Sequence, residues 1–143
     1  MSGPRDEALR LSNQLCFPLY AAARKVTGLY QPYLQPLGLT YTQYVTLLVL
    51  WEEDGQSVSA LGERLFLDSG TLTPLLKKLE QRGLVRRERS REDERVVLVR
   101  LTDEGRALKE QAREIPMKVG GCIQLSPEEA LSLYQTLYKL LNQ

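Results

Sequence analysis

The chain has 143 residues, of which 43% are hydrophobic and 26% are charged, and its net charge is +1 at pH 7. That length favours one domain with or without added dimerisation helices, and the composition is ordinary for a folded soluble protein. The chain has no histidine and two cysteines, Cys16 and Cys122. This excludes a histidine-based catalytic triad and argues against a zinc site, which normally needs three or four Cys or His ligands. We expect no metal or cofactor.

The sequence also argues against membrane insertion and secretion. No apolar run approaches the roughly 20 residues of a membrane span. The first ten residues are polar and lack the apolar stretch of a secretory signal. We therefore expect a cytoplasmic protein with no membrane partner, whose cysteines start as thiols in a reducing compartment.

The N-terminal part, near residues 8–35, is predicted to be helical but interrupted by prolines. Pro18 best fits the first turn of a helix, which places the start of the main helix near Cys16. Pro32 and Pro36 are then expected to end it. A capping box from Thr40 to Gln43 predicts the start of the next helix.

That next helix is expected to end at residues 54–55 and to direct Val45, Leu48 and Val49 toward the core. A short helix over residues 58–67 and a turn over 68–70 follow.

The helix after the turn carries a clear apolar stripe. Its leucines have the i, i+3, i+4, i+7 spacing of one buried helical face, and Gly83 is placed to end the helix in a left-handed conformation. Residues 84–89 and 95–101 are predicted strands joined by a polar tip, since the second contains a β-branched run. The stripe consists of Leu72, Leu75, Leu76 and Leu79.

Two more helices are predicted after the hairpin. Thr102 is expected to cap a helix that ends around Pro116, and a second capping box at Ser126 opens the last helix. The last helix has more apolar surface than a single buried face needs.

This element order predicts a mainly α fold with a small β-hairpin wing, that is, a winged helix-turn-helix. We expect an N-terminal dimerisation helix that carries Cys16 (residues 1–39), a DNA-binding domain (40–102) and C-terminal dimerisation helices (103–143). The terminal helices have no sheet or bundle of their own to cover, so they are expected to bury their apolar faces in a homodimer. Helix-turn-helix proteins commonly dimerise to read two half-sites.

Positive charge is concentrated on the third helix and the hairpin. Residues 69–91 contain seven Lys or Arg against two acids, a net +5, which leaves the rest of the chain at −4. Such a basic unit in a nearly neutral chain indicates a polyanionic partner, here double-stranded DNA. Lys78 and Arg82 are expected to face phosphate or solvent, and Asp93 to pair with an arginine and shape the turn. The expected DNA contacts are Ser69, Thr71, Thr73, Lys77, Lys78, Arg87, Arg89, Arg91 and Arg95.

Cys16 has two possible interpretations. A lone cysteine in an apolar helix is most often a small buried hydrophobe. Its place at the start of a helix favours a thiolate instead, because the helix dipole and the free N–H groups stabilise negative charge there.

Several separated motifs resemble the MarR family of bacterial transcriptional regulators. Asp93-x-Arg95 and the run Leu101-Thr102-Asp103-Glu104-Gly105 are similar to its signature. Residues 13–20 and 67–75 are similar to the organic hydroperoxide resistance regulators within it.

The resemblance implies roles for individual residues. Cys16 would be the reactive cysteine, and Cys122 the second cysteine of the two-cysteine type. Tyr20, Tyr30 and Tyr41 would support the Cys16 thiolate. In the wing, Asp93 would orient Arg95.

The resemblance therefore implies a repressor, not an enzyme. It would bind an inverted-repeat operator as a homodimer and release it when an organic hydroperoxide oxidises Cys16. A disulfide with Cys122 of the partner or of the same chain would follow. Two alternatives stay open: a MarR-type regulator that responds to another oxidant or to a small aromatic ligand, and a thiol peroxidase, to which the basic unit would be of no use.

Overall fold

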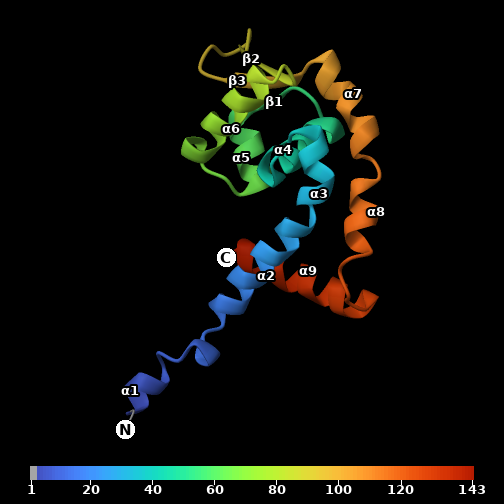
Figure 1. Cartoon of the computed structure of the whole chain (residues 1–143). Coiled ribbons are helices and arrows are strands. Elements are labelled where there is room, and N and C mark those ends of the chain that lie inside the picture. Colours follow the sequence, from blue (N-terminus) through green and yellow to red (C-terminus); the bar gives the residue numbers. More distant parts are fainter. Residues whose placement is uncertain (1–2) are drawn as a thin grey trace.

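The computed structural model describes residues 3–143; residues 1 and 2 of the expected N-terminal segment lie outside it. It is mainly helical, with a small antiparallel sheet at one edge of the body (Figure 1). The sheet has the order β1-β3-β2, from β1 (Gln56–Ser57), β2 (Val85–Arg89) and β3 (Val97–Leu101). The helical elements are α1 (Pro4–Glu7), η1 (Leu11–Asn13), α2 (Cys16–Leu29), α3 (Gln31–Leu34), η2 (Gln35–Leu37), α4 (Tyr41–Glu52), α5 (Val58–Leu65), α6 (Ser69–Gln81), α7 (Asp103–Ala112), α8 (Ile115–Gly120) and α9 (Pro127–Leu141).

Local capping signals set where the helices begin, as the sequence predicts. At α4, the Thr40 hydroxyl accepts from the Gln43 backbone N–H at 3.3 Å, and the Thr40 N–H donates to the Gln43 side chain at 3.1 Å. The same reciprocal box opens α9 at Ser126 and Glu129. Thr102 caps α7 by accepting from the backbone of Gly105. Each cap satisfies backbone donors that the helix itself leaves unpaired.

The leucine stripe of α6 forms the centre of the core, as predicted. Leu72, Leu76 and Leu79 are fully buried, and Leu75 is 8% exposed. Gly83 has φ +73° just beyond the helix, which is the left-handed conformation expected of it. The winged helix-turn-helix prediction is confirmed by α4, α5, α6 and the β2–β3 hairpin. The core also takes Leu34, Leu39, Leu108, Ala112, Ile115 and Val119 from outside residues 40–102.

The predicted core face of α4 is partly wrong. Leu48 is 39% exposed, whereas Tyr44, Leu47 and Leu50 are buried. The helix is enclosed by α3, α5, α6, α7 and β3, so burial covers more than one stripe. Sequence periodicity carries little information for a helix enclosed in this way.

One further expectation differs from the structure, and one strand was missed. The helix after the wing ends at Ala112, and a separate helix starts at Ile115. Pro116 belongs to the first turn of that second helix, where its missing N–H costs nothing, so it starts α8 and does not end α7. The strand β1 was not predicted, because two residues are too short for a pattern; it pairs Gln56 with Val99 and Ser57 with Leu98.

The terminal helices lie outside this core. Figure 1 shows the N-terminal segment projecting away from the body and α9 at the end opposite the wing. In contrast, α8 runs alongside the body and contributes Ile115 and Val119 to the core. Neither α2 nor α9 has a buried residue. Among residues 3–143, none of the helices combines the length and the apolar character needed to cross a membrane.

Candidate nucleic-acid interface and thiol site

The third helix, α6, presents a polar face opposite its leucines. Its first turn is fixed by Asp68, whose Oδ1 accepts from the Thr71 backbone N–H at 2.8 Å. That hydrogen bond lowers the pKa of Asp68, so the cap stays charged at neutral pH. The predicted contact residues of this helix are all exposed: Ser69, Thr71, Thr73, Lys77 and Lys78.

The wing presents a preorganised arginine. Asp93 accepts from Arg95 through three bonds, from Nε to Oδ1 at 3.1 Å, from Nη2 to Oδ2 at 3.2 Å and from the backbone N–H at 3.0 Å. The bonds with Arg95 lower the pKa of Asp93. The Arg95 side chain is nevertheless 91% exposed. Asp93 therefore orients Arg95 and leaves the guanidinium accessible to a phosphate or a DNA groove.

Other hairpin arginines have internal partners. Glu80 on α6 accepts from the Arg87 backbone N–H at 3.0 Å and from its Nη2 at 3.1 Å. Arg87 therefore joins β2 to α6. The sequence indicated only a DNA contact for this arginine. Arg89 donates to the Glu94 carbonyl at 2.7 Å and closes the hairpin tip, whereas Arg91 is exposed.

Arg82 is exposed, as predicted, but it also makes contacts that were not predicted. It was expected to face phosphate or solvent, but its guanidinium donates to the carbonyls of Gly38 and, at 3.0 Å, Leu37. The end of α6 is thereby joined to the turn that precedes α4. No local pattern could show this, because the partners lie 44 and 45 residues away in the sequence.

Both cysteines are free and exposed. Cys16 is the first residue of α2, as the sequence predicts. Cys122 lies between α8 and α9, and its Sγ is 3.5 Å from the Lys118 carbonyl oxygen. The chain therefore holds two thiols accessible to an oxidant.

The three predicted tyrosines do not form one group within the chain. Tyr30 and Tyr41 are in contact, with ring centroids 4.9 Å apart, and Tyr44 joins them at 5.7 Å from Tyr30. Tyr20 lies apart from this cluster, with the Arg24 guanidinium 5.5 Å from its ring centroid. Tyr44 was missed, although its position three residues after Tyr41 in one helix places both on the same face.

The surroundings of the cluster raise the pKa of two of its phenols. Burial raises the pKa of Tyr41 and of Tyr44, and the neighbouring Tyr30 raises both further. A neutral phenol can donate a hydrogen bond to an anion such as a thiolate.

Cys16 and the tyrosine cluster lie at opposite ends of α2. That helix has 14 residues, so its ends are roughly 20 Å apart at 1.5 Å per residue. Within one chain only Tyr20, one helical turn from Cys16, shares its end of the helix. Tyr30 and Tyr41 are too distant to hydrogen-bond the Cys16 thiol of their own chain.

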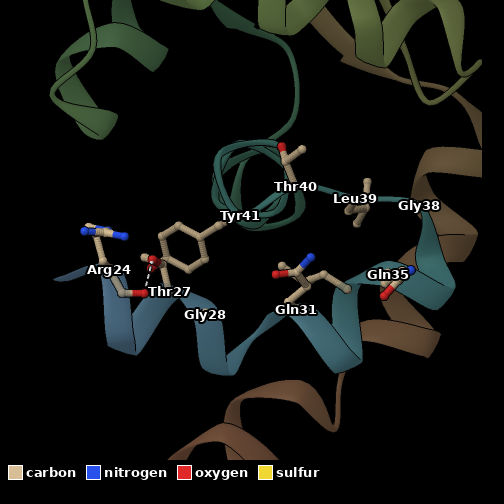
Figure 2. A pocket seen from close by; sticks show the side chains of 10 residues that line it. Arg24, Thr27, Gly28, Gln31, Gln35, Gly38, Leu39, Thr40 and Tyr41 are labelled. Atoms are coloured by element: carbon tan, nitrogen blue, oxygen red, sulfur yellow. Dashed lines mark hydrogen bonds between the residues drawn. The ribbon is translucent and has the colours of Figure 1, made fainter. Parts of the chain in front are cut away.

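A hollow of about 650 Å³ lies beside the cluster, between α2–α3 and α4. Figure 2 shows Tyr41 reaching from α4 toward Thr27 and Gly28 of α2, with Arg24 and Gln31 along the same wall. A Cβ placed on Gly28 would meet nothing within 4 Å, so the helix backbone is open to the hollow there. In the part of the chain that the structure describes, no cluster of three potential metal ligands occurs.

Comparison with known proteins identifies what the chain is similar to. A family model of the transcriptional regulators SarA/Rot matches residues 28–112. The chain is 51% identical to the organic hydroperoxide resistance transcriptional regulator of Bacillus subtilis (strain 168), over 94% of this chain and 91% of that protein.

Solved structures of a related regulator, AbfR of Staphylococcus epidermidis, share the fold. The structure of reduced AbfR bound to DNA matches with a TM-score of 0.79 and 40% identity, over 96% of both chains. The structure of disulfide-formed AbfR covers the same shares with 41% identity, but its TM-score is 0.66. The present structure is thus more similar to the reduced, DNA-bound form than to the disulfide form.

Proposed function

Because this chain belongs to the SarA/Rot group of MarR-type winged helix-turn-helix transcriptional regulators, we propose that it is a repressor that senses organic hydroperoxides. It binds operator DNA as a homodimer and releases it when Cys16 is oxidised. The observation that carries the proposal is the exposed, unpaired Cys16 at the start of α2, in a chain that is 51% identical to a hydroperoxide resistance regulator. It acts in the cytoplasm, as a sensor and not as an enzyme.

The basic α6–wing unit supplies DNA recognition. The exposed polar side chains of α6 face the major groove, and Arg95, oriented by Asp93, reaches a phosphate or the minor groove. The reduced, DNA-bound form of AbfR has the same fold, which supports this use of the unit.

A second copy of the chain covers the terminal helices. On α9, Leu131 is 58% exposed and Tyr134 is 60% exposed, and on the N-terminal segment Leu15 is 87% exposed. Monomers rarely leave large apolar side chains of two helices so exposed to water. A two-fold dimer buries both helices and sets two recognition helices for an inverted repeat.

The dimer also completes the thiol site. If the two α2 helices pair in opposite directions, Cys16 of one protomer lies beside Tyr30 and Tyr41 of the other. The roughly 20 Å that separates these groups in one chain is then crossed by symmetry. The hollow beside Gly28 gives the incoming segment and its peroxide room.

The chemistry needs only the two thiols and the peroxide. The Cys16 thiolate attacks the distal oxygen of the hydroperoxide, which breaks the O–O bond, leaves a sulfenic acid and releases the alcohol after proton uptake. The Cys122 thiol then attacks the sulfenic sulfur, which forms the disulfide and releases water. Tyr30 and Tyr41 hold the attacking thiolate by hydrogen bonds.

The test is a DNA-binding titration of the reduced dimer before and after an organic hydroperoxide, with wild type and Cys16→Ser side by side. Wild type should lose affinity after oxidation, and dithiothreitol should restore it. Cys16→Ser should bind equally well in both conditions. Release from Cys16→Ser by peroxide would contradict the proposal, and release by a small aromatic ligand without loss of thiol would favour a ligand-responsive regulator.

A further inference from the structure

The C-terminal end of the recognition helix is fastened to the segment that begins at Cys16. Arg82, the residue that caps α6, donates to the carbonyls of Gly38 and, at 3.0 Å, Leu37. These carbonyls end the run of α2, α3 and η2. A guanidinium presents several donors in a fixed plane, so it can hold two neighbouring carbonyls at once.

The turn at Gly38 is built to receive this guanidinium. Gly38 has φ +68°, a conformation that favours glycine, and a Cβ there would lie 2.7 Å from Arg82 Nη1. A side chain at this position would displace the arginine. Glycine therefore serves both the turn and the close approach of Arg82.

The N-terminal end of the recognition helix is joined to the segment that follows Cys122. Phe66, in the turn between α5 and α6, meets Tyr138 of α9 edge-on, with ring centroids 6.3 Å apart. Tyr138 in turn packs on Tyr134, with a centroid distance of 4.8 Å. The turn of the helix-turn-helix is thus linked to the last helix by a chain of aromatic rings.

Phe66 is also the only non-glycine residue with positive φ among residues 3–143, at +55°. Glycine or asparagine adopts this conformation with less strain. Neither would supply a ring for Tyr138. A bulky residue kept in a strained conformation indicates that its side chain has a task.

We propose that Arg82 and Phe66 are positioning residues that couple cysteine oxidation to the recognition helix. The inference rests on the proposed function. A disulfide between Cys16 and Cys122 requires their Cα atoms to come within about 7 Å. Bringing them together displaces α2, α9 or both, and the two contacts pass that displacement to opposite ends of α6. The helix then leaves the orientation that fits the major groove.

The test is the double variant Arg82→Lys, Phe66→Asn. Lysine keeps the charge but loses the planar fork, and asparagine keeps the left-handed turn but loses the ring. The dissociation constant for operator DNA is measured for reduced and oxidised protein, and disulfide formation is followed on a non-reducing gel. The variant should form the disulfide as wild type does, while its loss of affinity on oxidation should be at least tenfold smaller. Arg64→Lys, on α5 and paired with Glu52, is the matched control and should behave as wild type.

An equal fold-loss in wild type and double variant overturns the inference, even if the variant binds DNA more weakly when reduced, because a merely structural role predicts that pattern. If the double variant does not fold, Arg82→Lys and Tyr138→Leu are tested singly, and each should reduce the fold-loss. A wild type that keeps its DNA affinity after oxidation refutes the proposed function, and this inference falls with it.

Discussion

Both carboxylate oxygens of Asp93 accept hydrogen bonds from the Arg95 guanidinium, at 3.1 and 3.2 Å, at the tip of the wing. The Arg95 backbone N–H donates a third hydrogen bond to Asp93. Asp93 places a negative charge directly beside an arginine that is expected to meet DNA. That arrangement makes sense if orientation of the guanidinium matters more than the net charge of the wing, as in groove recognition.

Arg95→Ala should weaken DNA binding by roughly 1–3 kcal/mol if the side chain enters a groove. Asp93→Asn should have a smaller effect, because the amide keeps one acceptor and the arginine keeps its charge. Fluorescence anisotropy titrations at several salt concentrations measure both. Wild-type affinity in Arg95→Ala would show that this arginine does not contact DNA.

Because of the contact between Glu80 and Arg87, we expect the attachment of the wing to α6 to weaken at acidic pH. The pKa of Glu80 lies below its ordinary value of 4.5. The main cause is the hydrogen bond from the Arg87 backbone, and the bond from the Arg87 side chain adds to it. Because its pKa is lowered in the folded state, the ionised Glu80 carboxylate contributes its full stabilisation above pH 4.5. This stabilisation is lost as the pH falls through the lowered pKa.

The variant Glu80→Gln isolates that contribution. Chemical unfolding of wild type and Glu80→Gln should differ by a constant amount above pH 4.5 and converge as Glu80 is protonated. A difference in the free energy of unfolding that does not change between neutral and acidic pH would show that the Glu80 charge does not stabilise the fold.

Gly105 permits a close approach between α7 and the strand region. A Cβ on this residue would lie 2.1 Å from the Leu84 carbonyl oxygen. The Gly105 carbonyl also accepts from Trp51 Nε1 at 2.8 Å, so the backbone has little freedom to move away. Gly105→Ala should therefore lower the free energy of unfolding by about 1–3 kcal/mol, the cost of overpacking.

Gly120→Ala is the matched control for this change. Gly120 lies at the end of α8, and a Cβ there meets nothing within 4 Å. Alanine favours a helix over glycine, so this variant should be as stable as wild type or slightly more stable. Thermal melts measure the stability of both variants. Equal melting temperatures for Gly105→Ala and Gly120→Ala would contradict the packing argument.

Local signals in the sequence predicted much of the fold. Contacts between residues far apart in the sequence could not be predicted. The caps at Thr40, Thr102 and Ser126 and the leucine stripe of α6 are set by neighbours within a few residues, so they can be read directly. Arg82 and Trp51 find their partners 44 and 54 residues away, respectively, and Glu80 turns Arg87 inward through tertiary packing. Propensity and spacing hold no information on such pairs.

The sequence and its resemblance named candidate residues for a thiol site, but they could not place those residues relative to one another. Cys16 stands at the helix start that Pro18 indicates, and both thiols are free. The sequence resemblance also named Tyr30 and Tyr41, which do meet each other. In the proposed dimer, their relation to Cys16 depends on a second chain, and no local pattern in the sequence specifies how two chains pair.

Tyr30→Phe and Tyr41→Phe should slow peroxide sensing and leave the DNA affinity of the reduced protein close to normal, because each removes a single hydroxyl. The rate of thiol loss after addition of an organic hydroperoxide measures the first effect. Tyr44→Phe is the comparison within the same ring cluster, since Tyr44 is 2% exposed and its hydroxyl is not assigned to the thiol. Equal rates for wild type, Tyr30→Phe and Tyr41→Phe would remove the tyrosines from the sensing step.

The positions of the two cysteines favour a disulfide between subunits. Cys16 begins α2 and Cys122 precedes α9, and these are the helices that the proposed dimer interleaves. A bridge between subunits is therefore expected after oxidation, once the Cα atoms come within about 7 Å. On a non-reducing gel, peroxide-treated wild type should run as a covalent dimer that dithiothreitol separates.

Two variants distinguish the steps of that reaction. Cys122→Ser should still form a sulfenic acid at Cys16, detectable by a dimedone-type probe, but no covalent dimer, because no resolving thiol remains. Cys16→Ser should lose both products. A covalent dimer that persists in Cys16→Ser would refute the assigned order of attack. Wild type that releases DNA while it runs as a monomer would refute the bridge between subunits, and would leave a bridge within one chain or oxidation of Cys16 alone as the signal.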